Sequence, residues 1–315
     1  MAIPTISQVQ AVEPILTNML NGYQQSDDRF VAGRVFPAVS VDKDSGTYFI
    51  ATKKYFFFND LKPRAPGAPF ENLSFGFETD TYTTLQYAGA IALPDETQAN
   101  SQVPMSLDAA AVKRIAQASM IRKEVSWATD FMTTGVWGTT DNNSATDWDD
   151  YSSGDPVANI QVGKRTISNN TGNDPNTLVI GYIVLQALEN HPDLLDRIKY
   201  TQQATMGNAR NALAAALDVS SIVVGKATYS NTNESATFSA TAIIDDDALL
   251  CYVNPSAGIF DVTAGKTFIW GPGGGQGTMY RDRDNSLHAD VVQHKEQWDQ
   301  KVTASDVGYI WLDIV

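Results

Sequence analysis

The stretch from residue 105 to residue 134 constrains the fold most, because it contains neither glycine nor proline. Pro104 precedes it and Gly135 follows it, which is the punctuation expected at the two ends of a helix. At about 1.5 Å per residue this helix would be about 45 Å long, so we expect a strut, with a coiled coil as the weaker alternative. Apolar residues at spacings of three and four predict one buried stripe, formed by Leu107, Ala111, Ile115, Ala118, Ile121, Val125, Ala128 and Met132.

An aromatic hairpin is predicted before this helix. Residues 46–58 are rich in β-branched and aromatic side chains, and residues 70–84 alternate in polarity, so both segments predict strands. The proline-rich segment 59–69 between them must be a loop. A hairpin that carries four aromatic residues in a row at 55–58 needs a partner surface. Either a domain of the same chain or a neighbouring subunit could supply this surface.

Helices alternate with strands in the second half of the chain. We expect helices over 156–169, 182–189, 192–200 and 208–217 and strands over 177–180 and 220–224, which together describe a compact α/β domain. Two further strand-like segments, 287–302 and 306–315, close the chain. Both alternating sets of side chains in 306–315 are apolar, which predicts a strand buried on both faces.

Composition excludes several classes of protein. The net charge is 22 − 36 = −14, which argues against a general nucleic-acid binder, because phosphate contacts need clustered Lys and Arg. Charged residues make up only 18% of the chain, so much of its surface is expected to meet protein rather than water. A single cysteine, Cys251, excludes an internal disulfide framework and a cysteine-based zinc site. We find no membrane-spanning run and no secretory signal, and expect the chain to remain in the cytoplasm.

Three segments imitate catalytic or binding motifs. Gly265-Lys266-Thr267 lacks the upstream glycine of a phosphate loop, and 271–277 lacks the dinucleotide-binding spacing. The acidic run 245–247 lacks the pattern of a calcium loop and is predicted to be a solvated turn. The three histidines, His191, His288 and His294, show no metal-binding spacing and are interpreted as surface or strand residues. We therefore predict no catalytic, cofactor or metal site.

The order of these parts resembles the major capsid proteins of tailed bacteriophages, which have the Hong Kong 97 fold. The local sequence agrees in two places. Residues 30–37 (FVAGRVFP), followed by Val41-Asp42-Lys43 and Gly46-Thr47-Tyr48, look like the entry from arm to hairpin in one branch of these proteins. Residues 176–181 (NTLVIG), followed by 188–192 (LENHP), look like the start of the apical domain in the same branch.

The resemblance implies an α+β capsid fold with five parts. These are an N-terminal arm (1–45), an extended hairpin or E-loop (46–90), a peripheral domain with the spine helix (91–177, helix 105–134), an α/β axial domain (178–286), and C-terminal strands of the peripheral domain (287–315). The hairpin begins within the first fifty residues, so any scaffolding segment would be a separate chain or already removed.

The function implied is that of a structural subunit, not an enzyme, that self-assembles into the icosahedral head of a double-stranded DNA phage. Hexamers and pentamers of the chain would enclose DNA without sequence-specific binding, with separate scaffold, portal and decoration proteins as partners and no membrane. We expect non-covalent assembly in the host cytoplasm and a final location in the virion capsid. The residues predicted to contact other subunits lie in the hairpin: Lys53, Lys54, Tyr55, Phe56, Phe57, Phe58, Arg64, Phe75 and Phe77.

Other functions remain open at this point. An encapsulin-like compartment would share the fold but enclose a protein cargo. An enzyme with a site dispersed over the α/β domain would instead be a monodisperse monomer. A tail or decoration protein of the same virus fits the long helix less well.

Overall fold

A computed structural model of the chain describes residues 28–53, 57–67, 70, 72–73, 76–99, 104–141, 147–200, 209–230, 232, 239–273, 275 and 277–315. Most of the predicted arm therefore lies outside the described residues, as do Lys54, Tyr55, Phe56 and Phe75. Helices and strands are mixed, as the α+β class requires. No helix in the described part of the chain is long and apolar enough to cross a membrane.

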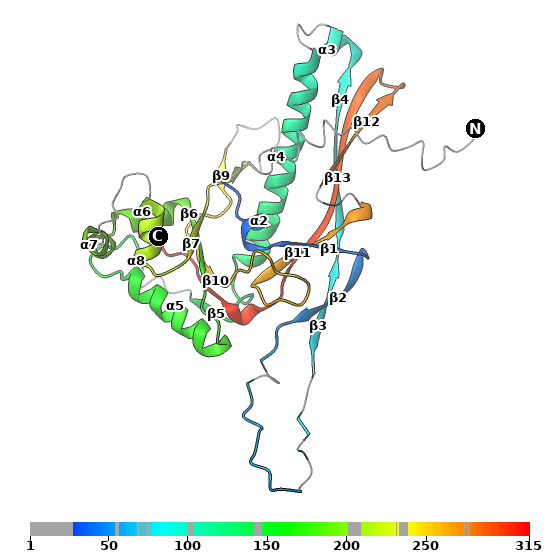
Figure 1. The fold of residues 1–315 in the computed structure, drawn as a ribbon. Coiled ribbons are helices and arrows are strands. Elements are labelled where there is room, and N and C mark those ends of the chain that lie inside the picture. Colours follow the sequence, from blue (N-terminus) through cyan, green and yellow to red (C-terminus); the bar gives the residue numbers. More distant parts are fainter. Residues whose placement is uncertain are drawn as a thin grey trace.

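The first of two large sheets is built around one long strand, β13 (Ala289–Val302). On one edge β13 pairs antiparallel with β4 (Leu85–Pro94) over ten residues. On its other edge it pairs with β12 (Thr278–Asp284) and then with β11 (Gly265–Trp270), and β1 (Ala38–Val41) extends the sheet beyond β11. The sheet and the long helix beside it form the upright limb in Figure 1.

The long helix is α4 (Pro104–Phe131), which begins one residue before the predicted start and ends three residues before the predicted end. Its first half packs on the first sheet, where Val112 and Ile115 meet Leu93 and Val292. The predicted stripe is wrong in one part, since Ala118 is exposed. The buried face instead includes two polar side chains, which periodicity of apolar residues could not predict: Ser119 and Glu124.

The second sheet contains the final strand of the chain. Its order is β5 (Thr139–Asp141), β14 (Gly308–Trp311), β10 (Ala248–Cys251), β6 (Thr177–Gly181) and β7 (Ser221–Gly225). All four residues of β14 are buried, so the prediction of a strand covered on both faces is confirmed. The pairing differs from the expected division of the chain, because β14 belongs to the α/β sheet, whereas β11 and β12 belong to the first sheet.

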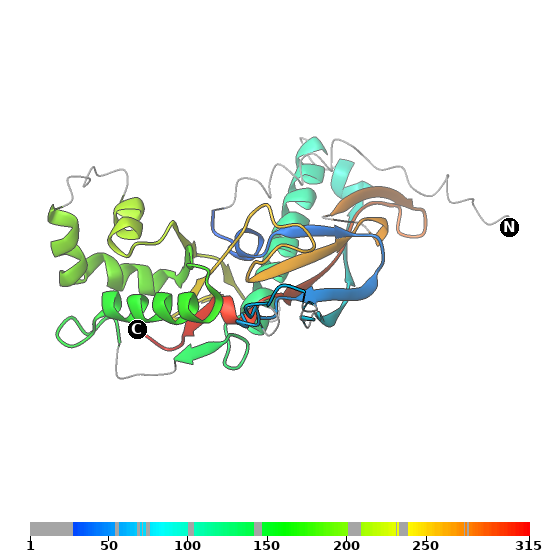
Figure 2. The same ribbon diagram turned by 60° about the horizontal axis from the view of Figure 1, so that its bottom comes forward.

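Different helices pack on the two faces of the second sheet. Helices α5 (Pro156–Thr171), α6 (Tyr182–Asn190), α7 (Pro192–Tyr200) and α8 (Ala209–Ala216) contribute to the core on one face, which includes Leu250 and Trp311. The opposite face, with Leu249 and Ile310, packs against the last turns of α4 and the short helix α2 (Ala32–Val35). This α/β part lies to the left in Figure 1 and is seen beside the upright limb in Figure 2.

The remaining elements are short. They are α3 (Asp95–Ala99) at the upper end of the upright limb, the strand pair β8 (Thr228–Tyr229) and β9 (Thr241–Ala242), and the 3-10 turns η3 (Gly271–Gly273) and η4 (Ser305–Val307).

The predicted hairpin exists, but its paired stem is short. Strand β2 (Ser45–Ile50) pairs with β3 (Glu78–Thr83) over six residues, whereas the sequence predicts strands over 46–58 and 70–84. The described residues between Ile50 and Glu78 form no ladder, and this segment leaves the body as the long descending loop of Figure 1. High β-propensity alone therefore does not extend the ladder, because the described residues of the loop pair with no strand.

Glu124 of α4 joins the spine to the end of the arm. Its carboxylate is buried and accepts hydrogen bonds at 2.8–2.9 Å from the backbone N–H groups of Val31 and Ala32, where α2 begins. Carboxylates favour this position because the first N–H groups of a helix have no partner within the helix. Phe36 then enters the core beside Trp127, with ring centroids 5.8 Å apart. The carboxylate therefore fixes where the arm meets the body.

We expect Glu124→Ala to lower the free energy of unfolding by about 2–4 kcal/mol, because it leaves two buried N–H groups without an acceptor. Glu124→Gln keeps one acceptor oxygen and should lose less. Urea denaturation measures the effect. Asp130→Ala, at an exposed position of the same helix, is the control and should change stability by no more than about 0.5 kcal/mol. Equal losses in the alanine variants at both positions would contradict this role of Glu124.

Candidate interaction surface

The loop of the hairpin is the least covered part of the described chain. Its large apolar side chains in the described residues are between 54% and 83% exposed: Phe57, Phe58, Leu61, Phe70, Leu73 and Phe77. Soluble monomers rarely expose so many large apolar groups in one segment, and such patches mark interaction sites. The exposed side chains make this loop a candidate interaction surface.

The tip of this limb is preorganised by local contacts. The Arg64 guanidinium lies over the ring of Phe70, 4.5 Å from its centroid. Pro63 and Pro66 restrict the backbone beside Arg64. A stiff tip loses little conformational entropy when it is bound.

The nine predicted contact residues have different positions. Phe57, Phe58 and Phe77 are exposed, as a contact residue in a free subunit should be, and Arg64 lies at the tip. Lys53 lies near the body instead, where its ammonium group is 2.9 Å from the Asp306 carboxylate of the same chain. Lys54, Tyr55, Phe56 and Phe75 lie outside the described residues. Contact with another subunit stays a prediction for all nine.

An apolar groove that sequence reasoning missed lies where the hairpin leaves the body. It has a volume of about 360 Å³ and is lined by the stem of the hairpin, by the end of α5 and by the loop between β10 and β11. The Phe49 ring lies 5.4 Å from Phe77 on one side and 5.4 Å from Phe260 on the other, between ring centroids. Only one signal in the sequence could have indicated it, namely the apolar residues Ile259, Phe260 and Val262 within a loop.

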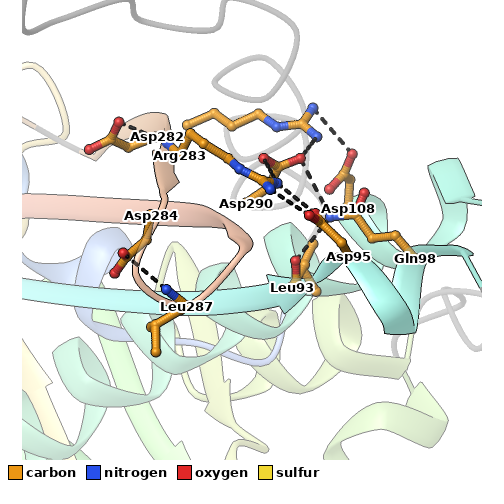
Figure 3. Close-up of polar contacts among 10 residues, drawn as sticks. Leu93, Asp95, Gln98, Asp108, Asp282, Arg283, Asp284, Leu287 and Asp290 are labelled. Atoms are coloured by element: carbon orange, nitrogen blue, oxygen red, sulfur yellow. Dashed lines mark hydrogen bonds and ion pairs between the residues drawn. The ribbon is translucent and has the colours of Figure 1, made fainter.

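A cluster of ion pairs stabilises the far end of the upright limb (Figure 3). Arg283 of β12 pairs with Asp95 of α3 at 2.6 Å and with Asp290 of β13 at 3.1 Å. Arg281 pairs with Asp290 at 2.9 Å and with Asp108 of α4 at 3.4 Å. Hydrogen bonds from the two arginines hold the pKa of Asp290 below its usual value.

The cluster joins the first turns of α3 and α4 to the β12–β13 hairpin. Gln98 adds hydrogen bonds to the Leu93 carbonyl at 3.0 Å and to Asp290 at 3.4 Å. The pairs are largely exposed, so each contributes little stability and their geometry matters more than their strength. All the charges pair within the chain, so the cluster has the features of a brace rather than of a binding site.

The phosphate-loop imitation is part of the core. Gly265 is the first residue of strand β11. Only glycine fits there, because a Cβ atom would lie 2.3 Å from the Phe36 ring. Lys266 is buried, and Thr267 pairs with Gln300 of β13. Residues 265–270 form strand β11, so the segment opens no helix whose N-terminus could bind a phosphate.

Two predictions about titratable residues need correction. His191 is buried rather than on the surface, with its Nε2 atom 3.1 Å from the Gly154 carbonyl. Asp247 is half-buried rather than solvated, and its carboxylate accepts a hydrogen bond from the Asp313 N–H at 3.2 Å. Burial, with some repulsion from Asp246 and Asp313, raises the pKa of Asp247 to about 6. Within the described residues no group of three His, Cys, Asp or Glu side chains could hold a metal ion.

Sequence comparison finds one informative relative. No model of a known protein family matches the chain. The chain is 28% identical over 239 residues to the major capsid protein of Burkholderia phage BcepMu, a match that covers 74% of each protein.

Similar structures cover nearly the whole chain. A phage-related protein from Bordetella bronchiseptica RB50 superimposes with a TM-score of 0.73 at 23% identity, covering 98% of both chains. The mature capsid of bacteriophage PhiM1 gives 0.55 at 12% identity, covering 90% of this chain and 86% of that one. A virus-like particle from Pyrococcus furiosus gives 0.55 at 11% identity, covering 94% and 98%. These similarities show a shared fold.

The position of Asp247 predicts a pH dependence of stability. A folded pKa near 6, above the unfolded value of about 3.9, means that ionisation of Asp247 costs stability as pH rises from about 4 to 6, and the cost is complete above that range. Asp247→Asn keeps an acceptor for the Asp313 N–H and should be more stable than the parent at pH 7.5, by about 1 kcal/mol after allowing for solvent screening.

Thermal melting of dissociated subunits at pH 4 and pH 7.5 checks this. The melting temperature of Asp247→Asn should exceed that of the parent at pH 7.5 and approach it at pH 4. Asp149→Asn, on an exposed turn, removes the same charge and serves as the control. A difference that is the same at both pH values would mean that Asp247 is not the titrating group.

Proposed function

We propose that this chain, which has the Hong Kong 97 fold of tailed-phage capsid proteins, is a major capsid protein that self-assembles into the icosahedral shell of a phage head. One observation carries the proposal: the chain resembles a phage major capsid protein in sequence over three quarters of its length and phage shells in fold over nearly all of it. The role is structural, and no reaction is assigned to the chain.

The uncovered hairpin gives this proposal its physical basis. Contacts between one surface of a subunit and a different surface of the next can close into rings and shells. A limb that leaves the body and exposes Phe57, Phe58 and Phe70 suits such a contact, because a neighbouring copy can cover what the chain itself leaves open. Aromatic side chains and Arg64 would supply most of the binding energy.

The parts of the subunit would then have separate positions in the shell. The upright limb with α4 would form the peripheral part, and the sheet of β6, β7, β10 and β14 with its helices would face the five- and sixfold axes. Hexamers and pentamers would enclose double-stranded DNA in a virion, after assembly in the host cytoplasm with separate scaffold, portal and decoration proteins. Net charge −14 would keep the enclosed DNA loosely held.

The compartment alternative has one observation in its favour, the shared fold of the Pyrococcus furiosus virus-like particle. Electron microscopy of purified particles, with analysis of their contents, distinguishes a phage head from a protein compartment. Enclosed DNA supports the phage head, whereas enclosed protein cargo without DNA supports a compartment.

We expect the double variant Phe57→Ser, Phe58→Ser to fold normally but to form no shells, because both rings are exposed in the subunit. Circular dichroism and thermal melting test folding, and electron microscopy tests assembly. The double variant Phe57→Tyr, Phe58→Tyr keeps both rings and serves as the control, because it should still assemble. Normal particles from Phe57→Ser, Phe58→Ser would refute the assignment of the hairpin.

Assembly is expected to be non-covalent. Lys53, the described lysine at the base of the hairpin, is paired with Asp306 of its own chain. Particles boiled in detergent should therefore run as one band at the mass of a single chain, 34.2 kDa. A ladder of covalent multimers would contradict this prediction.

A further inference from the structure

The loop between β10 and β11 presents an aromatic side chain to solvent. Phe260 is 78% exposed, and its neighbours Ile259 and Val262 are 44% and 41% exposed. Its ring forms one wall of the groove at the base of the hairpin, beside Phe49. The loop lies in the body of the molecule, separate from the hairpin tip (Figure 1).

A buried lysine fixes this loop. Lys266 is 1% exposed, and its ammonium group donates hydrogen bonds to the carbonyls of Ile259 at 2.9 Å and Asp261 at 2.8 Å, the two residues that flank Phe260. Asp261 accepts a hydrogen bond from the Gly258 N–H at 2.7 Å, and Thr263 is held by the Thr303 hydroxyl at 2.7 Å. The backbone on both sides of Phe260 is therefore fixed from inside the protein.

Burying the Lys266 ammonium group costs free energy, and the fold could form without this cost. Burial of an ammonium group is unfavourable, and it lowers the pKa of Lys266 below its usual value. The two carbonyls that it binds belong to exposed residues that water could have satisfied. What the lysine supplies is a rigid presentation of Phe260, and rigid aromatic anchors bind with a small loss of entropy.

The charges around the groove favour a copy of the same chain as its occupant. The charged residues that line it are Lys53, Lys266, Asp261 and Asp306, two of each sign, so the lining has no net charge. The chain as a whole carries −14, so two copies repel over most of their surfaces. A neutral apolar groove, continuous with the exposed rings of Phe57 and Phe77, is where two acidic copies can approach.

We propose that Phe260, held outward by Lys266, is an anchor that packs against a second copy of this chain at the groove beside the hairpin. The inference rests on the proposed shell function and adds a contact surface on the body of the subunit. Lys266 acts as a positioning residue, and Phe260 supplies the contact.

The test measures the lowest protein concentration at which shells form, by light scattering and electron microscopy. Phe260→Ser should raise it by at least about tenfold, and Phe260→Tyr should restore assembly, because the ring is retained. Lys266→Met should raise it as well, whereas Lys266→Arg keeps donors for both carbonyls.

Hydroxyl-radical labelling of Phe260 reports the contact directly. The ring should be labelled in dissociated subunits and protected in shells of the parent chain alone. Labelling at the same rate in both states, or protection that needs an added second protein, would overturn the inference. If Phe260→Ser forms shells normally while Phe57→Ser, Phe58→Ser does not, the inference fails and the proposed function stands. If the parent chain forms no shells, either alone or together with the other head proteins of its phage, the proposed function itself fails.

Discussion

The structure depends on one helix that is buried in two different cores. The first half of α4 packs on the sheet of β4 and β13 through Val112 and Ile115, and its last turns pack on the sheet of β10 and β14 through Trp127 and Phe131. Sharp helix kinks occur mostly at proline, glycine or local irregularities, and α4 contains no glycine or proline after Pro104. Packing of its first half and of its last turns therefore joins the upright limb to the α/β part through one continuous element.

Buried charges complete this frame. Glu124 holds the end of the arm against α4, and Glu296 of β13 holds the middle of the helix through Lys123 at 2.7 Å and Ser119 at 2.8 Å. Burial alone would raise the pKa of Glu296, but the contacts with His294, Lys123 and Ser119 lower it to about 2. A buried carboxylate is costly unless it is paired and hydrogen-bonded, so these contacts favour one position of the helix on the sheet.

This frame allows the chain to leave other surfaces uncovered. The hydrophobic cores enclose most of the large buried apolar side chains, whereas the described rings of the hairpin loop and Phe260 lie outside them. These exposed groups can then serve contacts between copies, with geometry set by the short β2–β3 stem and by Lys266.

The sequence by itself determined the elements whose cause is local. The absence of glycine and proline predicted α4, and apolar side chains in both alternating sets predicted that β14 is buried on both faces. The helices and strands between residues 156 and 225 lie within a few residues of their predicted bounds. The resemblance to phage capsid proteins also came from the order of these elements. Tertiary structure alone decided which strands pair, so that β14 joins β10 rather than β13, and how far the hairpin ladder extends. It alone placed Glu124, Lys266 and Phe260, because the partners of a buried charge or an exposed ring come from distant parts of the chain, and local periodicity carries no information about them.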